Sequence, residues 1–422
     1  MNDLYLLAIN LTQRCNLACS HCYLDAKTLQ HGASDELSCD EVCALLDSVA
    51  DRSSETMVVL TGGEPLLRPD LEIMVQHGSG LGLAMVVGTN GIMLTERRVL
   101  ALREAGLLGA GISVDSLDPS RHDDFRGKPG CWQKTMLGID ACRRHGLSFQ
   151  IHFTVTERNA HEVFDIIAFC KAKGARVLNV FFLVCTGRGE SFLDISPQRY
   201  EEVIREIIEA QSQNPDLIIR PRCAPYYKRI AHQLNPDAPI NRISGQEGDG
   251  CIAATHYCRV TPTGEVTACP YIDTSVGSIR QQSLVEIWDQ APQFQLLRHP
   301  QLGGKCGDCE YRKLCGGCRA RPVAMGGGIL DADPWCTYQP QGEAVIEPLS
   351  TASTNVSWSI EAEIRVSRVP GFIRRMVRKK AEVYAKECGA KEVTVDHLDR
   401  LTARRFGGRK PPAVLRRWKQ RQ

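Results

Sequence analysis

Short apolar segments alternate with longer amphipathic ones from the N-terminus to about residue 220. The short segments have the length of buried strands, and the longer ones repeat their apolar residues at helical spacing. Such alternation predicts βα units around a parallel sheet. Six units predict an α/β fold, a partial, TIM-like (β/α)6 barrel whose ligands collect at the C-terminal ends of the strands. The predicted strands are Leu4–Asn10, Thr56–Thr61, Ala84–Thr89, Gly111–Asp115, Ser148–Thr154 and Val177–Leu183.

Two local signals add detail to this pattern. A helix is predicted over Ser38–Asp51, since Ser38 followed by Glu41 has the spacing of a capping box. Farther along, Gly264 separates two short apolar segments, Cys258–Pro262 and Glu265–Cys269. These segments predict two short strands joined by a turn at the glycine.

Three cysteines follow the first predicted strand, in the spacing C-x3-C-x2-C: Cys15, Cys19 and Cys22. Thiolates are the soft ligands of iron–sulfur clusters, and three of them on one short loop leave one iron of a four-iron cube open for another ligand. A zinc knuckle or three ordinary buried cysteines are the alternatives. The loop resembles that of the radical S-adenosylmethionine (SAM) superfamily, and this resemblance implies a [4Fe-4S] cluster that chelates SAM.

Further motifs stand at the ends of the predicted strands, and the first is Thr61-Gly-Gly-Glu-Pro65. Its adjacent glycines let the backbone approach a ligand closely, although a tight turn would use them equally well. Within the same resemblance this motif holds the methionine amine of SAM, and His21 takes the position of a residue that stacks on adenine. The SAM-binding residues that the resemblance implies are His21, Tyr23, Gly62, Gly63, Glu64, Asn90, Ser113, Asp115, Arg126 and Arg188.

A second cysteine-rich region extends from Cys251 to Cys336 and contains eight cysteines, enough for two four-ligand clusters. Zinc is the alternative that spacing leaves open. Downstream of a SAM barrel, the region resembles the SPASM extension, which carries auxiliary [4Fe-4S] clusters. The resemblance implies one or two such clusters, an inner one on Cys251, Cys258, Cys269 and Cys318, and an outer one on Cys306, Cys309, Cys315 and Cys336.

The composition changes after Cys336. The expected domains are a barrel over 1–225, a SPASM region over 226–340, a linker over 341–356, a small helical module over 357–401 and a basic tail over 402–422. The module resembles the C-terminal module of light-independent protochlorophyllide reductase. From residue 361 onward, 18 Lys and Arg stand against 7 Asp and Glu, a net charge of +11 that leaves −9 for the rest of the chain.

The cysteine content and the net charge indicate the cellular compartment and the kinds of partner. With 19 cysteines in 422 residues and no secretory leader pattern, a reducing cytoplasm with cluster ligands is expected instead of a disulfide scaffold. No apolar run reaches the roughly 18 residues of a membrane span. The overall net charge of +2 argues against a nucleic-acid binder.

For the substrate, Phe181-Phe-Leu-Val-Cys-Thr-Gly-Arg-Gly189 resembles the corresponding stretch of enzymes of the alternative haem pathway. Arg188 could pair with a propionate, or it could merely contact the SAM carboxylate or a structural Asp. The hypothesis is a radical SAM oxidoreductase that decarboxylates iron-coproporphyrin III to haem b, with ferredoxin or flavodoxin as electron donor. A related step on a haem d1 or didecarboxysirohaem precursor, a peptide maturase and an electron-transfer protein are the alternatives. No general acid or base can be named.

Overall fold

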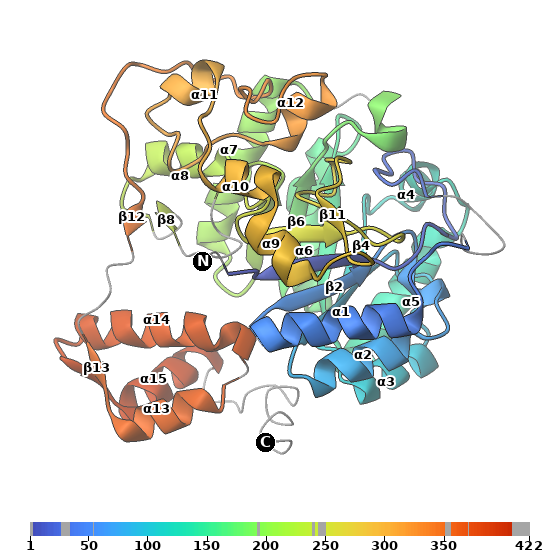
Figure 1. Cartoon of the computed structure of the whole chain (residues 1–422), viewed down its shortest axis with the longest axis horizontal. Coiled ribbons are helices and arrows are strands. Elements are labelled where there is room, and N and C mark those ends of the chain that lie inside the picture. The colour runs from blue at the N-terminus through green and yellow to red at the C-terminus, as the bar shows by residue number, and fades with distance from the viewer. Residues whose placement is uncertain are drawn as a thin grey trace.

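One ten-stranded sheet runs through the larger part of the molecule (Figure 1), in the order β11-β10-β9-β1-β2-β3-β4-β5-β6-β7. The structure is a computed structural model and describes residues 3–26, 34–53, 55–191, 195–238, 241–243, 250–350, 356–369 and 371–406. Seven strands between residues 6 and 222 run parallel. They are β1 (Leu6–Asn10), β2 (Met57–Thr61), β3 (Ala84–Thr89), β4 (Gly109–Ser113), β5 (Ser148–Val155), β6 (Val177–Phe182) and β7 (Ile218–Arg222).

The predicted α/β class is confirmed, and the six predicted strands of the sheet are present with their ends shifted by at most two residues. β4 begins at Gly109, two residues before the predicted start. β7 was not predicted, because Arg220, Pro221 and Arg222 interrupt its short apolar run. Proline lacks a backbone N–H, but a strand at the end of a sheet tolerates it, and β7 is the last strand in the order.

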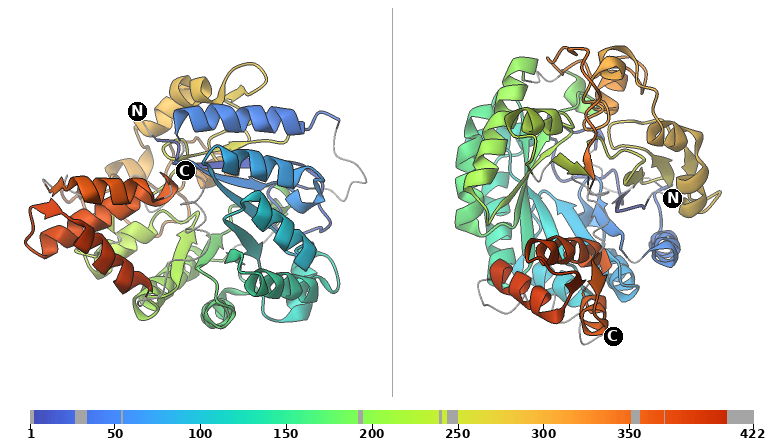
Figure 2. Two further views of the ribbon diagram at one scale, coloured as in Figure 1. Left: turned by 90° about the horizontal axis from the view of Figure 1, so that it is seen from below. Right: turned by 90° about the vertical axis from the view of Figure 1, so that its left-hand side faces the viewer.

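Helices between the parallel strands cover one face of the sheet, as the two views of Figure 2 show. The predicted capping box is present at the first of them: the Ser38 hydroxyl accepts from Glu41 N at 3.1 Å, and the Glu41 carboxylate accepts from Ser38 N at 2.8 Å. These helices are α1 (Cys39–Arg52), α2 (Leu71–Gly80), α3 (Glu96–Ala105), α4 (Pro119–Arg126), α5 (Cys131–Arg144), α6 (Val163–Lys173) and α7 (Pro197–Gln213), with short 3-10 turns η1 (Pro65–Leu67), η2 (Ala160–Glu162) and η3 (Gly187–Ser191).

The two faces of the sheet differ in character. Toward the helices, strand residues such as Ile112, Ile151 and Leu178 are fully buried in the main hydrophobic core. Side chains alternate along a strand, so the next residues point to the opposite face. That face, here named the inner face, carries Ser113, His152, Asn179, Arg220 and their neighbours of the same parity.

The second half of the chain extends the same sheet beyond β1. β9 (Tyr257–Val260) pairs in parallel with β1, and β10 (Glu265–Thr267) and β11 (Gly277–Ser278) follow antiparallel. The predicted turn lies between β9 and β10, where Gly264 has a φ of +92°. The remaining elements of this region are α8 (Tyr227–Leu234), β8 (Arg242–Ile243), α9 (Leu284–Gln290), α10 (Pro292–Arg298), α11 (Gly304–Asp308), α12 (Ala320–Ala324) and β12 (Leu349–Ser350), which pairs with β8.

The C-terminal module has a small core of its own, which contains Ala362, Ala381 and Val393. In Figure 1 it forms a separate group of helices beside the sheet domain. It comprises β13 (Ser357–Trp358), α13 (Ile360–Ser367), α14 (Gly371–Glu387), β14 (Glu392–Val393) and α15 (Val395–Phe406). The predicted tail lies outside the described residues from 407 onward. Among the described helices, none has the length and apolar character needed to cross a bilayer.

Candidate active site

The three cysteines of the first motif lie together on the loop that follows β1. Cys15 and Cys22 pack against a small apolar cluster that includes Cys19 and Leu17. Two backbone bonds hold the loop against the end of α4: Ala18 N donates to Arg126 O at 3.2 Å and Ser20 N to Phe125 O at 3.1 Å. The motif therefore reaches the C-terminal edge of the sheet as one preformed unit.

Burial affects the pKa values of two of these thiols. Burial raises the pKa of Cys15 to about 12, and burial also raises the pKa of Cys19 above its usual value. Without a metal both side chains are neutral thiols, because a buried thiolate lacks solvation. Three cysteines gathered on one loop fit the predicted [4Fe-4S] cluster, whose irons would take the place of the thiol protons.

Gly62 and Gly63 pack against the cysteine loop itself. A Cβ on Gly63 would lie 2.0 Å from Arg14 O, and one on Gly62 would lie 2.6 Å from Thr12 O. Gly63 N donates to Thr12 O at 2.7 Å, and Glu64 N donates to Arg14 O at 2.8 Å. These glycines let the backbone pack closely against the chain's own cysteine loop. The predicted approach to SAM stays a prediction.

The Glu64 side chain joins the loops after β2 and β3. Its buried carboxylate accepts from Leu66 N at 3.1 Å, from the Thr89 hydroxyl at 2.7 Å and from Asn90 N at 2.9 Å. Burial raises its pKa above the ordinary value. Asn90 in turn donates from its side chain to Asn16 Oδ1, at 2.7 Å, within the cysteine loop. Glu64 and Asn90 thus fix the relative positions of three loops at this edge of the sheet.

Asp115 and Arg126 form a buried ion pair next to Cys19. Their side chains are 0% and 8% exposed, and an Arg126 nitrogen lies 3.7 Å from Cys19 Sγ. Asp115 also accepts from Thr154 N at 3.0 Å. Burial by itself would raise the pKa of Asp115, but the adjacent Arg126 cation brings that pKa below its usual value. Ser113, another of the predicted SAM-binding residues, is partly exposed on the inner face, whereas Asp115 is buried.

The two aromatic candidates lie on either side of Cys22. His21 stacks on Phe125 with ring centroids 4.4 Å apart and an interplanar angle of 24°. Tyr23 meets Tyr271 edge-on at 5.4 Å, which links the cysteine loop to the segment after β10. One face of the His21 ring is therefore covered by Phe125.

Arg188, in the segment after β6, donates hydrogen bonds to the cysteine loop and to the residues that follow it. Its Nε donates to Cys19 O at 2.9 Å, and its Nη1 donates to Asp25 Oδ1 at 2.9 Å and to Ala26 O at 2.8 Å. Of the three alternatives raised by the sequence, the structure shows the contact with an aspartate. A propionate would have to share the guanidinium with these partners.

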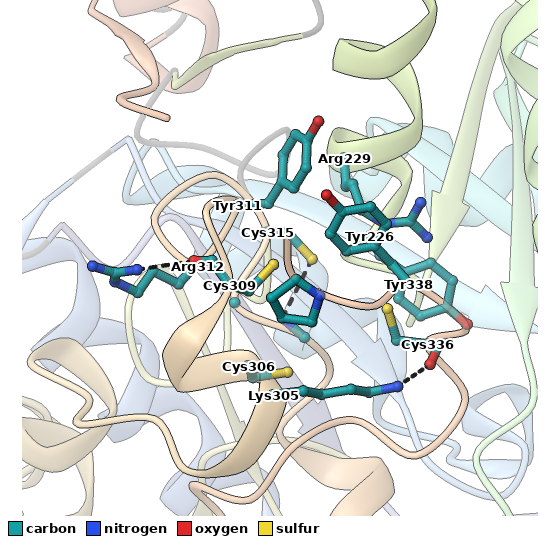
Figure 3. A pocket seen from close by; sticks show the side chains of 13 residues that line it. Tyr226, Arg229, Lys305, Cys306, Cys309, Tyr311, Arg312, Cys315, Cys336 and Tyr338 are labelled. Carbon is teal, nitrogen blue, oxygen red and sulfur yellow. Dashed lines mark hydrogen bonds between the residues drawn. The ribbon is translucent and has the colours of Figure 1, made fainter. Parts of the chain in front are cut away.

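Four cysteines of the second region line one pocket, shown in Figure 3: Cys306, Cys309, Cys315 and Cys336. They are the four that the sequence grouped as the outer set. Two backbone amides point at their sulfurs, since Gly317 N lies 3.4 Å from Cys315 Sγ and Asp333 N lies 3.5 Å from Cys306 Sγ. Amide bonds to sulfur are typical of iron–sulfur sites, where they tune the reduction potential. The pocket thus fits a cluster.

The inner set is divided in the structure. Cys269 and Cys318 lie in or against a second apolar cluster around Val184 and Ile272. Cys258 lies instead inside the main core, fully buried. Within the described residues no group of His, Cys, Asp or Glu converges as the ligands of a single metal ion do, whereas the thiolates around a cubane bind different irons and stand farther apart.

Sequence reasoning missed a buried ion pair beside this set, Arg321 with Asp333, whose side chains are 3% and 0% exposed and 3.2 Å apart. It also missed Cys223, which packs against the same apolar cluster as Cys318. Cys223 has no cysteine within a few positions, so spacing gave no signal for it.

Three family models match parts of the chain. The radical SAM superfamily model matches residues 9–170, the iron–sulfur cluster-binding SPASM domain model matches 251–318, and the model of the proto-chlorophyllide reductase 57 kD subunit matches 358–401. The fold is similar to Streptococcus suis SuiB bound to S-adenosylmethionine (TM-score 0.65, 16% identity, 80% of this chain and 78% of that one). It is also similar to native anSMEcpe with bound AdoMet (TM-score 0.62, 18% identity, 79% and 94%).

Two relatives share more of the sequence. The AdoMet-dependent heme synthase of Methanosarcina barkeri is 40% identical over 79% of this chain and 97% of its own length. That of Oleidesulfovibrio alaskensis is 36% identical over 80% and 88%. The predicted cofactors are confirmed: a [4Fe-4S] cluster, SAM and auxiliary iron–sulfur clusters. The chain is a radical SAM enzyme with a SPASM region, and it belongs to the family of the AdoMet-dependent heme synthases.

Proposed function

We propose that this enzyme converts the propionates of iron-coproporphyrin III to vinyl groups and so produces haem b. The observation that carries the proposal is the 40% identity to a heme synthase along nearly all of that protein's length. Identity to the pre-heme d1 synthase of Dinoroseobacter shibae is 27%, and to the PqqA peptide cyclase of Rhizobium meliloti 28%. These two represent the alternative substrates, a different tetrapyrrole and a peptide.

The inner face of the sheet offers suitable chemistry for a porphyrin with carboxylate arms. In register across β5, β6 and β7, His152 pairs with Asn179 and Asn179 with Arg220. Arg222 follows on the same face, next to Phe181, and its Nε donates to Asn179 Oδ1 at 2.9 Å. Arginine binds carboxylate in a bidentate way, and an aromatic ring packs against a flat macrocycle. Arg220 and Arg222 are therefore the residues proposed to bind propionates.

The His152 ring on this face packs against Gly111 of the neighbouring strand β4. A Cβ on Gly111 would lie 2.4 Å from the His152 ring. Any larger residue on β4 would displace the imidazole toward the centre of the barrel. Gly111 thus lets the imidazole lie against the sheet.

The cofactors supply the bond-breaking chemistry: bound SAM and the reduced cluster provide a 5′-deoxyadenosyl radical, which removes hydrogen from a propionate carbon. Loss of CO2 then leaves a vinyl group and one electron. The auxiliary iron–sulfur region is proposed to accept this electron. The protein's own residues hold the reactants: Glu64 and Asn90 fix the loops, and the Asp115–Arg126 pair fixes the edge beside Cys19.

The test is anaerobic turnover of the reconstituted enzyme with SAM, a reductant and one of three substrates: iron-coproporphyrin III, didecarboxysirohaem or a PqqA-type peptide. Haem b with one 5′-deoxyadenosine per propionate converted is the expected result. Turnover of the peptide or of didecarboxysirohaem, without turnover of the coproporphyrin, would overturn the proposal.

Variants locate the binding site. Arg222→Met should weaken porphyrin binding about 10- to 100-fold, because a hydrogen bond to a charged group contributes about 1.5–3 kcal/mol. The matched control is Arg158→Met, which removes a solvent-exposed arginine paired with Asp124 on the surface. If both variants bind the porphyrin with equal affinity, the inner face is not the porphyrin-binding site.

A further inference from the structure

Cys258 lies on the wrong face of the sheet to share a cluster with Cys251, Cys269 and Cys318. It pairs in register with Leu7 of β1, so it points, like Leu7, into the core beneath the helices. Its neighbours Tyr257 and Arg259 alternate to the opposite face, where Arg259 donates to Pro270 O at 2.9 Å, one residue beyond Cys269. The strand period therefore separates Cys258 from the segment that carries Cys269.

Cys223 lies where a fourth ligand is needed. It follows directly after β7 and packs against the same apolar cluster as Cys269 and Cys318. Its backbone has a φ of +59°, a left-handed conformation that residues other than glycine rarely adopt. Strained backbone of this kind gathers at functional sites, where the surrounding structure imposes it.

A buried polar network fixes Cys223 relative to Cys318. Arg321 donates to Cys223 O at 3.1 Å, and the Tyr200 hydroxyl donates to the same oxygen at 2.8 Å. Arg321 also pairs with Asp333, whose carboxylate accepts from Cys318 N at 2.8 Å. Two cysteines that are 95 positions apart in the sequence are thus held by one arginine–carboxylate unit.

The electrostatics agree with this grouping. The pKa of Cys269 is raised well above its usual value, first by burial and then by the neighbouring Cys223, Cys318 and Cys251. For Cys258 burial is again the main cause of a raised pKa, and the charge that acts on it is Arg298 of α10. Cys258 therefore has the surroundings of a core residue.

We propose that Cys223, together with Cys251, Cys269 and Cys318, binds the inner auxiliary cluster, and that Cys258 is a core residue without a metal. This arrangement attaches the cluster directly to the end of β7. The next residue back along that strand is Arg222, on the inner face. A redox centre on Cys223 therefore lies next to the substrate-binding face, whichever substrate the enzyme uses.

The test compares Cys223→Ala with Cys258→Val and with Cys170→Ala, a control that removes a buried cysteine of α6. Each full-length variant is reconstituted anaerobically and analysed for iron, sulfide and its electron paramagnetic resonance spectrum. Cys223→Ala should lose about four irons or show the signal of a three-iron cluster, and the SAM-dependent signal of the first cluster should remain. The other two variants should keep the wild-type iron content. Loss of a cluster in Cys258→Val, or an unchanged spectrum in Cys223→Ala, would overturn the proposal.

A second measurement uses the wild-type chain and does not depend on how a variant folds. Iodoacetamide labelling followed by peptide mass spectrometry should leave Cys223 and Cys251 unmodified in the reconstituted protein. After oxidative removal of the clusters both should react, because both are partly exposed. Cys258 should stay unmodified in either state because it is fully buried. Labelling of Cys223 while the clusters are intact would contradict the assignment.

Discussion

The buried pair of Asp115 and Arg126 provides a quantitative test of how the site is held. Replacing Arg126 by Met keeps much of the side-chain volume but leaves the Asp115 carboxylate, which is 0% exposed, without its cation. The remaining bond to Asp115 Oδ1 comes from Thr154 N. Removing one partner of a buried ion pair costs about 3–5 kcal/mol. The double variant Arg126→Met with Asp115→Asn has no buried charge, so it should recover most of this loss.

The loss of stability in Arg126→Met should depend on pH. In Arg126→Met, burial is no longer offset, so the pKa of Asp115 should rise above its unfolded value of about 3.9. A group with a raised folded pKa loses its contribution to stability as the pH increases. The destabilisation should therefore be larger at pH 8 than at pH 5.5.

The assay is thermal unfolding of the wild type, both single variants and the double variant, followed by circular dichroism at the two pH values. A loss of 3–5 kcal/mol corresponds to a decrease of about 5–15 °C in the unfolding midpoint. Arg126→Met should be less stable than the double variant. If it is not, or if it is destabilised equally at both pH values, Arg126 does not stabilise the buried charge of Asp115.

Three further predictions concern other parts of the chain. Gly63→Ala should lose the iron of the first cluster, because its Cβ would lie 2.0 Å from Arg14 O, while Gly80→Ala, with free space around it, should retain all iron on elemental analysis. His122, whose pKa burial lowers to about 4, resists protonation in the folded state. Stability present at neutral pH should therefore decrease as the pH falls from about 6.5 toward 4, and urea midpoints of His122→Asn should decrease less over that range. Truncation after residue 350 should preserve SAM cleavage, measured as 5′-deoxyadenosine, because the module has its own core; loss of cleavage would show that the module supports the barrel.

The sequence alone determined the features that depend on local order. The alternation of apolar segments predicted the parallel sheet, since strand and helix periods are local properties. The spacing of Cys15, Cys19 and Cys22 predicted one shared loop, because so few residues separate them. The four cysteines that the SPASM resemblance assigned to the outer set line one pocket in the structure. Three members of this set, Cys306, Cys309 and Cys315, lie within ten positions of the sequence.

The tertiary structure decided which way side chains point and which residues distant in the sequence come into contact. Cys258 is seven residues from Cys251 in the sequence, yet the pleat of β9 turns its side chain to the opposite face. The sequence left three partners open for Arg188, and the fold of the cysteine loop brings Cys19 O and Asp25 to its guanidinium. Cys223 gave no local signal, and only the packing of β7 against the second cysteine region brings it to Cys318. A sequence specifies which side chains are available, whereas the face of a strand and the return of a loop specify which of them meet.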